Sequence, residues 1–215
     1  MPTDETNRLS IDEILALPQL YRNNLINSIS GFKSASLLGT KDEAHGSNLA
    51  IFSSVTHFGS NPPILGFVTR PTTVPRNTYK NIKQSGYYTI NHVNSEIIKK
   101  AHQTSAKYEE DVNEFEVCDL TEQWTEHPAP YVKEANVKIG MKFEEEYPIK
   151  ANGTILVLGK IIEIQVAPTY LKEDGFLDLA AADTVTINGL DAYLAPKRLS
   201  RFEYARPNQT LTEIK

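Results

Sequence analysis

The chain has 215 residues, a formal net charge of -5 and a single cysteine, Cys118. A chain of this length can bury roughly 70–75% of its unfolded surface, so it can hold a full core without covalent cross-links. One cysteine excludes a disulfide within the chain and argues against a cysteine-based zinc or iron–sulfur site. The acidic balance argues against a nucleic-acid partner, which would require clustered Lys and Arg.

Two features bear on where the protein resides. The first ten residues, MPTDETNRLS, contain no apolar core of the kind that a signal peptide needs. No stretch of the chain approaches the roughly 18 consecutive apolar residues of a membrane-spanning helix. Together with the single cysteine, these features predict a cytoplasmic protein without a membrane partner.

The N-terminal part of the chain is predicted to begin with a helix and to continue as strands. Residues 10–17 form the helix, because Ser10 and Glu13 have the spacing of a capping box and Pro18 cannot continue it. The short apolar segments 25–29 and 35–40 are then predicted to be the first strands.

The middle of the chain alternates between strand and helix signals. Pro62-Pro63 breaks the chain before a predicted strand at 64–69, because proline cannot donate to a sheet ladder. Residues 77–84 have helical character, and Gly86 ends that helix. Aromatic and β-branched residues then predict a strand at 87–93.

The C-terminal half is predicted to hold two long strands, at 137–145 and 154–166, with the hairpin signal Asn152-Gly153 between them. The other predictions are a helix capped by Ser95 that runs to Ala101, an irregular excursion with one short helix at 103–130, and a last strand at 199–204 before a loose tail. Strands dominate, so the fold class predicted is mainly β, an antiparallel β-barrel with a few inserted helices.

Several common catalytic motifs are missing from the sequence. The eleven glycines never stand two apart, so there is no GxGxxG dinucleotide fingerprint, and neither a GxxxxGK[ST] loop nor a GxSxG elbow occurs. The five histidines show no HxxxH pairing, so no metal site is expected. Cys118 stands among acidic residues, which raise a thiol pKa, and is expected to be a small buried residue.

One segment, residues 39–71, combines glycine and small hydroxyl residues around an apolar centre, which lets a backbone approach a flat ligand closely. In the turn that follows, Arg70 and Arg76 could grip a phosphate, and Asn77 could open a helix whose free amides point at an anion. Residue chemistry alone leaves a second interpretation open, in which the Ser-rich strand is ordinary and the arginines only solvate a surface loop.

The order of short motifs resembles the flavin reductase-like, FMN-binding family. The motifs are SNLAIFSS at 47–54, PPILGF at 62–67, Arg70, Arg76-Asn77-Thr78 with Asn81-Ile82, Gly86, and YTIN at 88–91. Weaker similarity follows at Lys107, Glu114-Phe115, GLDAY at 189–193 and RFEYARP at 201–207. The resemblance implies a split β-barrel domain at 20–207, between an N-terminal extension at 1–19 and a tail at 208–215. It also implies a homodimer.

The resemblance further implies which residues hold the cofactor FMN. The flavin ring is expected to lie against Ser47, Asn48, Leu49, Ala50, Ser53 and Ser54. The phosphate is expected near Arg76 and Thr78, with Asn77 and Arg70 assisting. The sequence TTVPRNT at 72–78 departs from the Ser-x-Thr type of phosphate turn that many flavin reductases carry.

Hydride transfer takes place at the flavin itself, so no catalytic side chain is expected and none can be named. The leading hypothesis is an oxidoreductase that reduces flavin or a small acceptor with NADH or NADPH as co-substrate. The alternatives are a flavoredoxin-like electron carrier without its own nicotinamide site, and a non-catalytic flavin-binding module. His45 and His92 lie near the predicted site and are expected to be ordinary satisfied polar residues.

Overall fold

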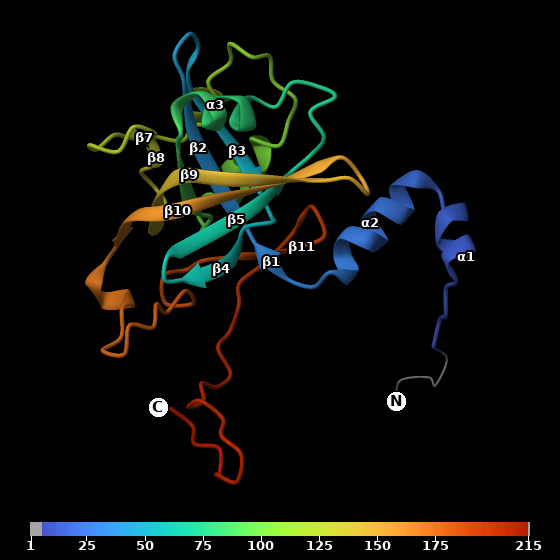
Figure 1. Cartoon of the computed structure of the whole chain (residues 1–215), viewed down its shortest axis with the longest axis vertical. Helices are drawn as coiled ribbons and strands as arrows, with labels where there is room; N and C mark the ends of the chain where they lie inside the picture. The colour runs from blue at the N-terminus through green and yellow to red at the C-terminus, as the bar shows by residue number, and fades with distance from the viewer. Residues whose placement is uncertain (1–5, 215) are drawn as a thin grey trace.

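The computed structural model describes residues 6–214. Its centre is a sheet of seven strands in the order β3-β2-β6-β9-β10-β5-β4, and every neighbouring pair is antiparallel (Figure 1). The strands are β2 (Ser36–Asp42), β3 (Gly46–Phe52), β4 (Thr56–Ser60), β5 (Pro63–Thr69), β6 (Tyr87–His92), β9 (Val137–Ile149) and β10 (Thr154–Val166).

Chain connectivity forces this sheet to curl into a barrel. The strands β3 and β4 lie at opposite edges of the sheet, yet only residues 53–55 link them. In a flat sheet the two outer strands would be about 29 Å apart at the usual spacing between strands, whereas three linking residues span at most about 15 Å. The two edges therefore approach each other, which is the split β-barrel predicted from the sequence.

The hairpin between β9 and β10 forms as its turn residues predict. Gly153 has a φ of 72°, a left-handed conformation that favours glycine. The side-chain oxygen of Asn152 accepts a hydrogen bond of 3.1 Å from the N–H of Thr154. The prediction of two long strands joined at Asn152-Gly153 is confirmed, and both strands reach 13 residues.

Two apolar cores lie on opposite faces of the sheet. The barrel core consists of Leu38, Phe67, Ile82, Tyr88, Ile90, Ile139, Met141 and Val157. The outer core includes Leu37, Leu49, Val93, Phe115 and Val185, together with their buried neighbours. The alternation of Leu37 and Leu38 between the two cores explains why β2 has an unbroken run of buried residues rather than an alternating pattern.

The helices and small sheets cover the barrel and its outer face. Helix α3 (Asn77–Ser85) contributes Ile82 to the barrel core, and Gly86 caps it with a φ of 75°. The remaining elements are α4 (Ile98–Gln103), α5 (Glu114–Val117), η1 (Pro168–Tyr170), the pair β7 (Glu122–Gln123) and β8 (Tyr131–Val132), and the sheet of β1 (Lys33–Ser34), β11 (Thr186–Asn188) and β12 (Ala192–Leu194).

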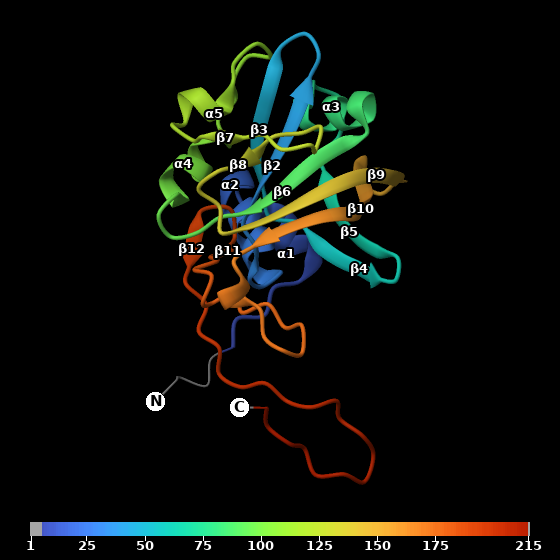
Figure 2. The ribbon, with the colours of Figure 1, turned by 90° about the vertical axis from the view of Figure 1, so that its left-hand side faces the viewer.

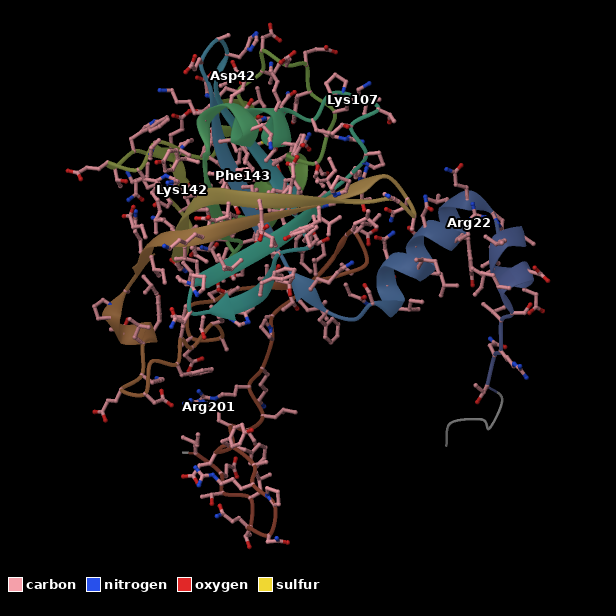
Figure 3. The ribbon with its side chains drawn as sticks, viewed as in Figure 1. Arg22, Asp42, Lys107, Lys142, Phe143 and Arg201 are labelled. Carbon is pink, nitrogen blue, oxygen red and sulfur yellow. The ribbon has the colours of Figure 1, made fainter. Side chains whose placement is uncertain are left out.

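Two arms leave the barrel (Figures 1 and 2). The N-terminal arm is formed by α1 (Ile11–Ala16) and α2 (Gln19–Ile29), neither of which contains a buried residue. The C-terminal arm, residues 195–214, folds back on itself through a bridge between Phe202 and Glu213. Arg198 and Arg201 fix the base of this arm by ion pairs with Asp178 and Asp174, and Figure 3 shows Arg201 at that base.

Three predictions of local structure are wrong. Residues 25–29 were predicted to form a strand but belong to helix α2. The prediction failed because a five-residue apolar segment is too short to distinguish strand periodicity from helix periodicity. Ser95 does not cap α4, which starts after Ile97; its hydroxyl bonds the carboxylate of Asp183 instead. Residues 199–204 form no strand beyond the single bridge at Phe202, whereas the short strands β11 and β12 were not predicted.

The remaining element predictions are confirmed. Ser10 and Glu13 form the capping box of α1, and the strands at 35–40, 64–69 and 87–93 match β2, β5 and β6 within two residues. The excursion at 103–130 holds the short helix α5. Within residues 6–214, no helix is long and apolar enough to cross a membrane.

Candidate functional site

The predicted ring-binding segment is the edge strand β3. Because β3 pairs with β2 alone, half of its backbone N–H and C=O groups point away from the sheet. Its side chains alternate: Leu49 and Ile51 pack in or against the outer core, whereas Phe52 packs against the barrel core. Leu49 is fully buried, so its side chain belongs to the core rather than to an open ligand surface.

A buried polar cluster ties this strand to the start of helix α3. The side-chain oxygen of Asn48 accepts hydrogen bonds of 3.2 Å from the hydroxyls of both Thr40 and Thr78. Its amide nitrogen lies 2.9 and 2.8 Å from the two carboxylate oxygens of Glu114. The fold therefore brings the predicted ring segment and the predicted phosphate segment together, through Asn48 and Thr78.

The link between β3 and β4 contains two serines with different surroundings. The hydroxyl of Ser54 accepts a hydrogen bond of 3.0 Å from the N–H of Val68 and donates one of 3.2 Å to its carbonyl oxygen. It thereby closes the barrel against β5. Neighbouring Ser53 is half-buried, and its hydroxyl has no hydrogen bond to any residue in 6–214, so it stays available to a ligand.

The turn before α3 presents an anion-binding arrangement. Arg76 occupies the cap position of α3, no side chain caps the helix start, and no acidic residue lies in the first turn. The Nε atom of Arg76 donates to the carbonyl oxygen of Pro71 at 3.2 Å. Its two terminal nitrogens have no hydrogen bond or ion pair with any described residue, and neither does exposed Arg70. Free helix N–H groups beside a held guanidinium suit a phosphate.

The ten predicted site residues thus separate into two groups. In the first group, side-chain polar groups lack a partner in the described chain; its members are Ser53, Arg70, Arg76 and Asn77. Ala50, which is half-buried and close to Ser53 in the sequence, is placed with them. Asn48, Leu49, Ser54 and Thr78 have their side chains engaged within the protein, and Ser47 is nearly buried. That any of the ten contacts a flavin remains a prediction.

Glu114 is the residue of this site for which no role was predicted from the sequence. The motif similarity at Glu114-Phe115 was its only signal, because its partners Asn48 and Leu49 stand 66 and 65 positions earlier. Burial raises the pKa of Glu114, and the hydrogen bonds from Leu49 and Asn48 oppose that rise. Its charge also adds to the effect of burial in raising the pKa of Cys118, which is buried as predicted.

The two histidines near the site differ in their surroundings. His45 is exposed and bonds Asp42 at 3.1 Å. His92 is half-buried, and burial lowers its pKa to about 4. Its Nδ1 atom is buried without a partner in the described chain, and so is the hydroxyl of Ser36, which pairs with it across the strands. The expectation that His92 is satisfied does not hold for this nitrogen.

A hollow of about 380 Å³ lies beside the hairpin between β2 and β3, where Figure 3 labels Asp42. Hydrogen bonds from the N–H groups of Ala44 and His45 lower the pKa of Asp42 to about 2. Asp42, His45 and Glu110 could offer three ligand atoms to a cation. However, the ammonium group of Lys80 bonds the carboxylates of both Asp42 and Glu110, so the protein supplies its own cation there.

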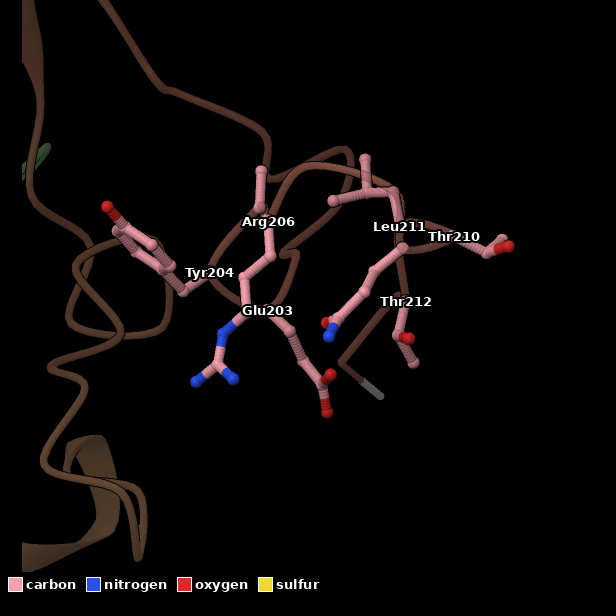
Figure 4. Close-up of a pocket in the computed structure, with 8 residues that line it drawn as sticks. Glu203, Tyr204, Arg206, Thr210, Leu211 and Thr212 are labelled. Carbon is pink, nitrogen blue, oxygen red and sulfur yellow. The ribbon is translucent and has the colours of Figure 1, made fainter.

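A second hollow, of about 70 Å³, lies within the C-terminal arm (Figure 4). Its lining comes only from residues 203–212, including Tyr204, Arg206 and Leu211. Small-molecule sites usually have volumes of roughly 300–1,000 Å³. This hollow is therefore too small for a cofactor and results from the folding of the arm on itself.

Known proteins resemble the chain in sequence and in fold. A split-barrel protein from Shewanella frigidimarina NCIMB 400, named for flavin reductase, is 46% identical, with a TM-score of 0.89 over 93% of this chain and 100% of that one. Flavoredoxin of Desulfovibrio vulgaris (Miyazaki F) is 25% identical, with a TM-score of 0.67 over 78% of this chain and 88% of that one.

Curated relatives come from two organisms. Uncharacterized proteins from Aquifex aeolicus and Methanothermobacter thermautotrophicus are 28% and 32% identical over 59% and 50% of this chain. The matches span only 65% and 53% of those relatives' lengths. The sequence profile of the flavin reductase-like domain matches residues 32–180, which covers β1 to η1 and all seven strands of the barrel. The chain therefore belongs to the flavin reductase-like domain family.

Proposed function

We propose that this chain binds FMN and works as a flavoprotein oxidoreductase that takes a hydride from NADH or NADPH. The observation that carries the proposal is the turn at 70–78. Arg76 is held by Pro71, its terminal nitrogens are free of partners in the described chain, and the start of α3 is uncapped beside it. This donor set fits a dianionic phosphate, and the Asn48–Thr78 bond ties it to β3.

The residues with free polar groups would bind the cofactor, and those with engaged groups would shape its site. Arg76, the first N–H groups of α3 and Arg70 would hold the phosphate. Ala50 and Ser53 would lie along the ring, where the open edge of β3 offers backbone N–H and C=O groups to the pyrimidine edge. When bound, FMN would supply the hydride-accepting and electron-transferring chemistry at its N5 position. No protein acid or base is needed for that step.

The test is the absorption spectrum of the purified protein, reconstituted with FMN and recorded under anaerobic conditions with and without NADH or NADPH. We expect flavin absorption that either nucleotide bleaches. A protein that binds neither FMN nor riboflavin would refute the proposal. Bleaching by dithionite but by neither nucleotide would refute the nicotinamide part alone.

A second candidate function is that of a flavin-bound electron carrier. The similarity to a flavoredoxin favours it. The lack of a dinucleotide fingerprint does not separate the two functions, because a nicotinamide can stack on a flavin in a shallow groove. In that case a reduced protein partner, and not NADH or NADPH, would bleach the bound flavin. The same anaerobic titration separates the two functions, because only the nucleotide-dependent enzyme turns over with nicotinamide as sole reductant.

We also propose that the protein is a homodimer in the cytoplasm. Both arms expose large apolar side chains, among them Leu20 at 73%, Leu199 at 88% and Tyr204 at 88%. Exposed apolar side chains on segments that leave the domain are typical of contacts between subunits. Sedimentation of the full chain and of a variant shortened at residue 195 tests this. A full chain that sediments as a monomer would contradict the proposal.

A further inference from the structure

Glu114 is a buried carboxylate at the open edge of β3. It is 6% exposed and lies on the short helix α5, within the excursion at 103–130. One of its oxygens accepts a bond of 3.0 Å from the N–H of Leu49, an edge group that has no strand to pair with. Both oxygens lie within 2.9 Å of the amide nitrogen of Asn48.

Burying a carboxylate is costly unless hydrogen bonds replace its lost hydration. Here the bonds come from two consecutive residues of a single strand. Their effect is to fix the amide plane of Asn48, so that its oxygen points at Thr40 and Thr78. Since Thr78 lies in the first turn of α3, the orientation of Asn48 sets where β3 lies relative to that turn.

We propose that Glu114 is a positioning residue of the flavin site: acting through Asn48, it holds the ring-binding strand β3 in register with the phosphate-binding start of α3. This inference rests on the proposed function. It also narrows that function, because Glu114 occupies the N–H of Leu49 and the amide of Asn48. Ring contacts of β3 and its link to β4 must then come from residues 50–53, and not from Asn48 or Leu49.

A reciprocal exchange of chemical groups tests the proposal. Glu114→Gln sets an amide N–H₂ against the amide nitrogen of Asn48, while its oxygen can still accept from Leu49. Asn48→Asp sets a second carboxylate against Glu114. In the double variant the Gln amide donates to the Asp, the Gln oxygen accepts from Leu49, and the second Asp oxygen still accepts from Thr78. Glu116→Gln is the matched control, because Glu116 is exposed on the same helix and its side chain has no bond within residues 6–214.

We measure the dissociation constants for FMN and riboflavin, and the urea midpoint of the flavin-free protein. Each single variant should lower both affinities about ten-fold or more, as expected when buried donors lose their acceptor. The double variant should recover to within about three-fold, and Glu116→Gln should change neither affinity. Recovery distinguishes positioning from general damage, and the urea midpoint shows that every variant is folded at the assay condition.

The two proposals fail in different ways. If the wild type binds flavin but the single variants bind it equally well, the positioning role is overturned and the proposed function stands. The same holds if the single variants lose affinity and the double variant does not recover it. If the wild type binds no flavin, both are overturned.

Discussion

Arg76 offers the most direct test of how this family member would hold its cofactor. Its Nε is bonded to the carbonyl oxygen of Pro71 at 3.2 Å, which fixes the guanidinium before any ligand arrives. The terminal nitrogens have no partner in the described part of the chain, so they can form two parallel bonds to a phosphate. Arg76→Ala removes these donors, and the bond from Nε to Pro71 is the one side-chain hydrogen bond to the described residues that it breaks.

The magnitude follows from the type of bond lost. A hydrogen bond to a charged group contributes about 1.5–3 kcal/mol, which corresponds to an increase of about 10- to 150-fold in Kd. The prearranged guanidinium favours the upper part of that range, because binding FMN costs little side-chain entropy. The assay is titration of the flavin-free protein with FMN and, separately, with riboflavin. Binding is monitored by the quenching of flavin fluorescence.

The comparison of ligands makes this prediction specific. Riboflavin has the same ring but no phosphate, so it cannot lose a phosphate contact. Arg76→Ala should therefore leave the affinity for riboflavin within about two-fold of the wild-type value. Lys83→Ala, at the other end of α3, removes a positive charge that pairs with Glu146 and should change neither affinity. Equal losses for FMN and riboflavin, or unchanged FMN affinity, would refute the assignment of Arg76 to the phosphate.

Three further predictions concern stability and the ring-binding segment. Ser54→Ala should lower the free energy of unfolding by about 1 kcal/mol, because the half-buried N–H of Val68 loses its acceptor. Ser53→Ala should leave the free energy of unfolding unchanged and weaken the binding of both FMN and riboflavin. Urea unfolding and flavin titration distinguish the two variants. Leu49→Ala should cost about 2–5 kcal/mol as a cavity in the outer core, and a smaller loss by urea unfolding would mean that this side chain is not packed as described. Burial lowers the pKa of His92 from 6.5 to about 4, so the unfolded chain binds the proton more tightly. Stability should therefore fall as the pH drops from 6.5 towards 4, by at most about 3 kcal/mol, and His92→Gln should remove this dependence in urea melts at several pH values.

Local signals in the sequence predicted most of the barrel. The strand β10 and its hairpin follow from periodicity and from Asn152-Gly153, and α3 ends where Gly86 adopts a positive φ. The prediction failed at 25–29, where five residues gave too short a window. Leu20 and Tyr21 extend the apolar segment backwards within one continuous helix, α2. No residue of that helix packs into a core, so the sequence does not show the apolar stripe by which a helix packed on a core is usually recognised.

The contacts of the candidate site could not be predicted, because they join distant parts of the chain. Glu114 reaches Asn48 across 66 positions, and Thr78 reaches it across 30. No spacing rule covers such separations, since they depend on how the barrel closes and where the excursion at 103–130 folds back. The motifs identified which residues gather at the site, but they did not reveal which side chains face a ligand and which face one another.

This distinction changes what the motif residues mean. Asn48 and Thr78 were predicted as flavin contacts, yet the hydroxyl of Thr78 donates to Asn48, and the amide of Asn48 is also bonded to neighbours. A residue can serve a ligand by touching it or by fixing the residues that do. The two roles have different signatures: loss of a phosphate contact such as Arg76 separates FMN from riboflavin, whereas loss of the scaffold around Asn48 weakens both alike. The ratio of the two losses therefore identifies the motif residues that touch the phosphate, without requiring that the flavin be seen in place. A ring contact such as Ser53 weakens both flavins as the framework does, and its unchanged stability on substitution distinguishes it from a framework residue.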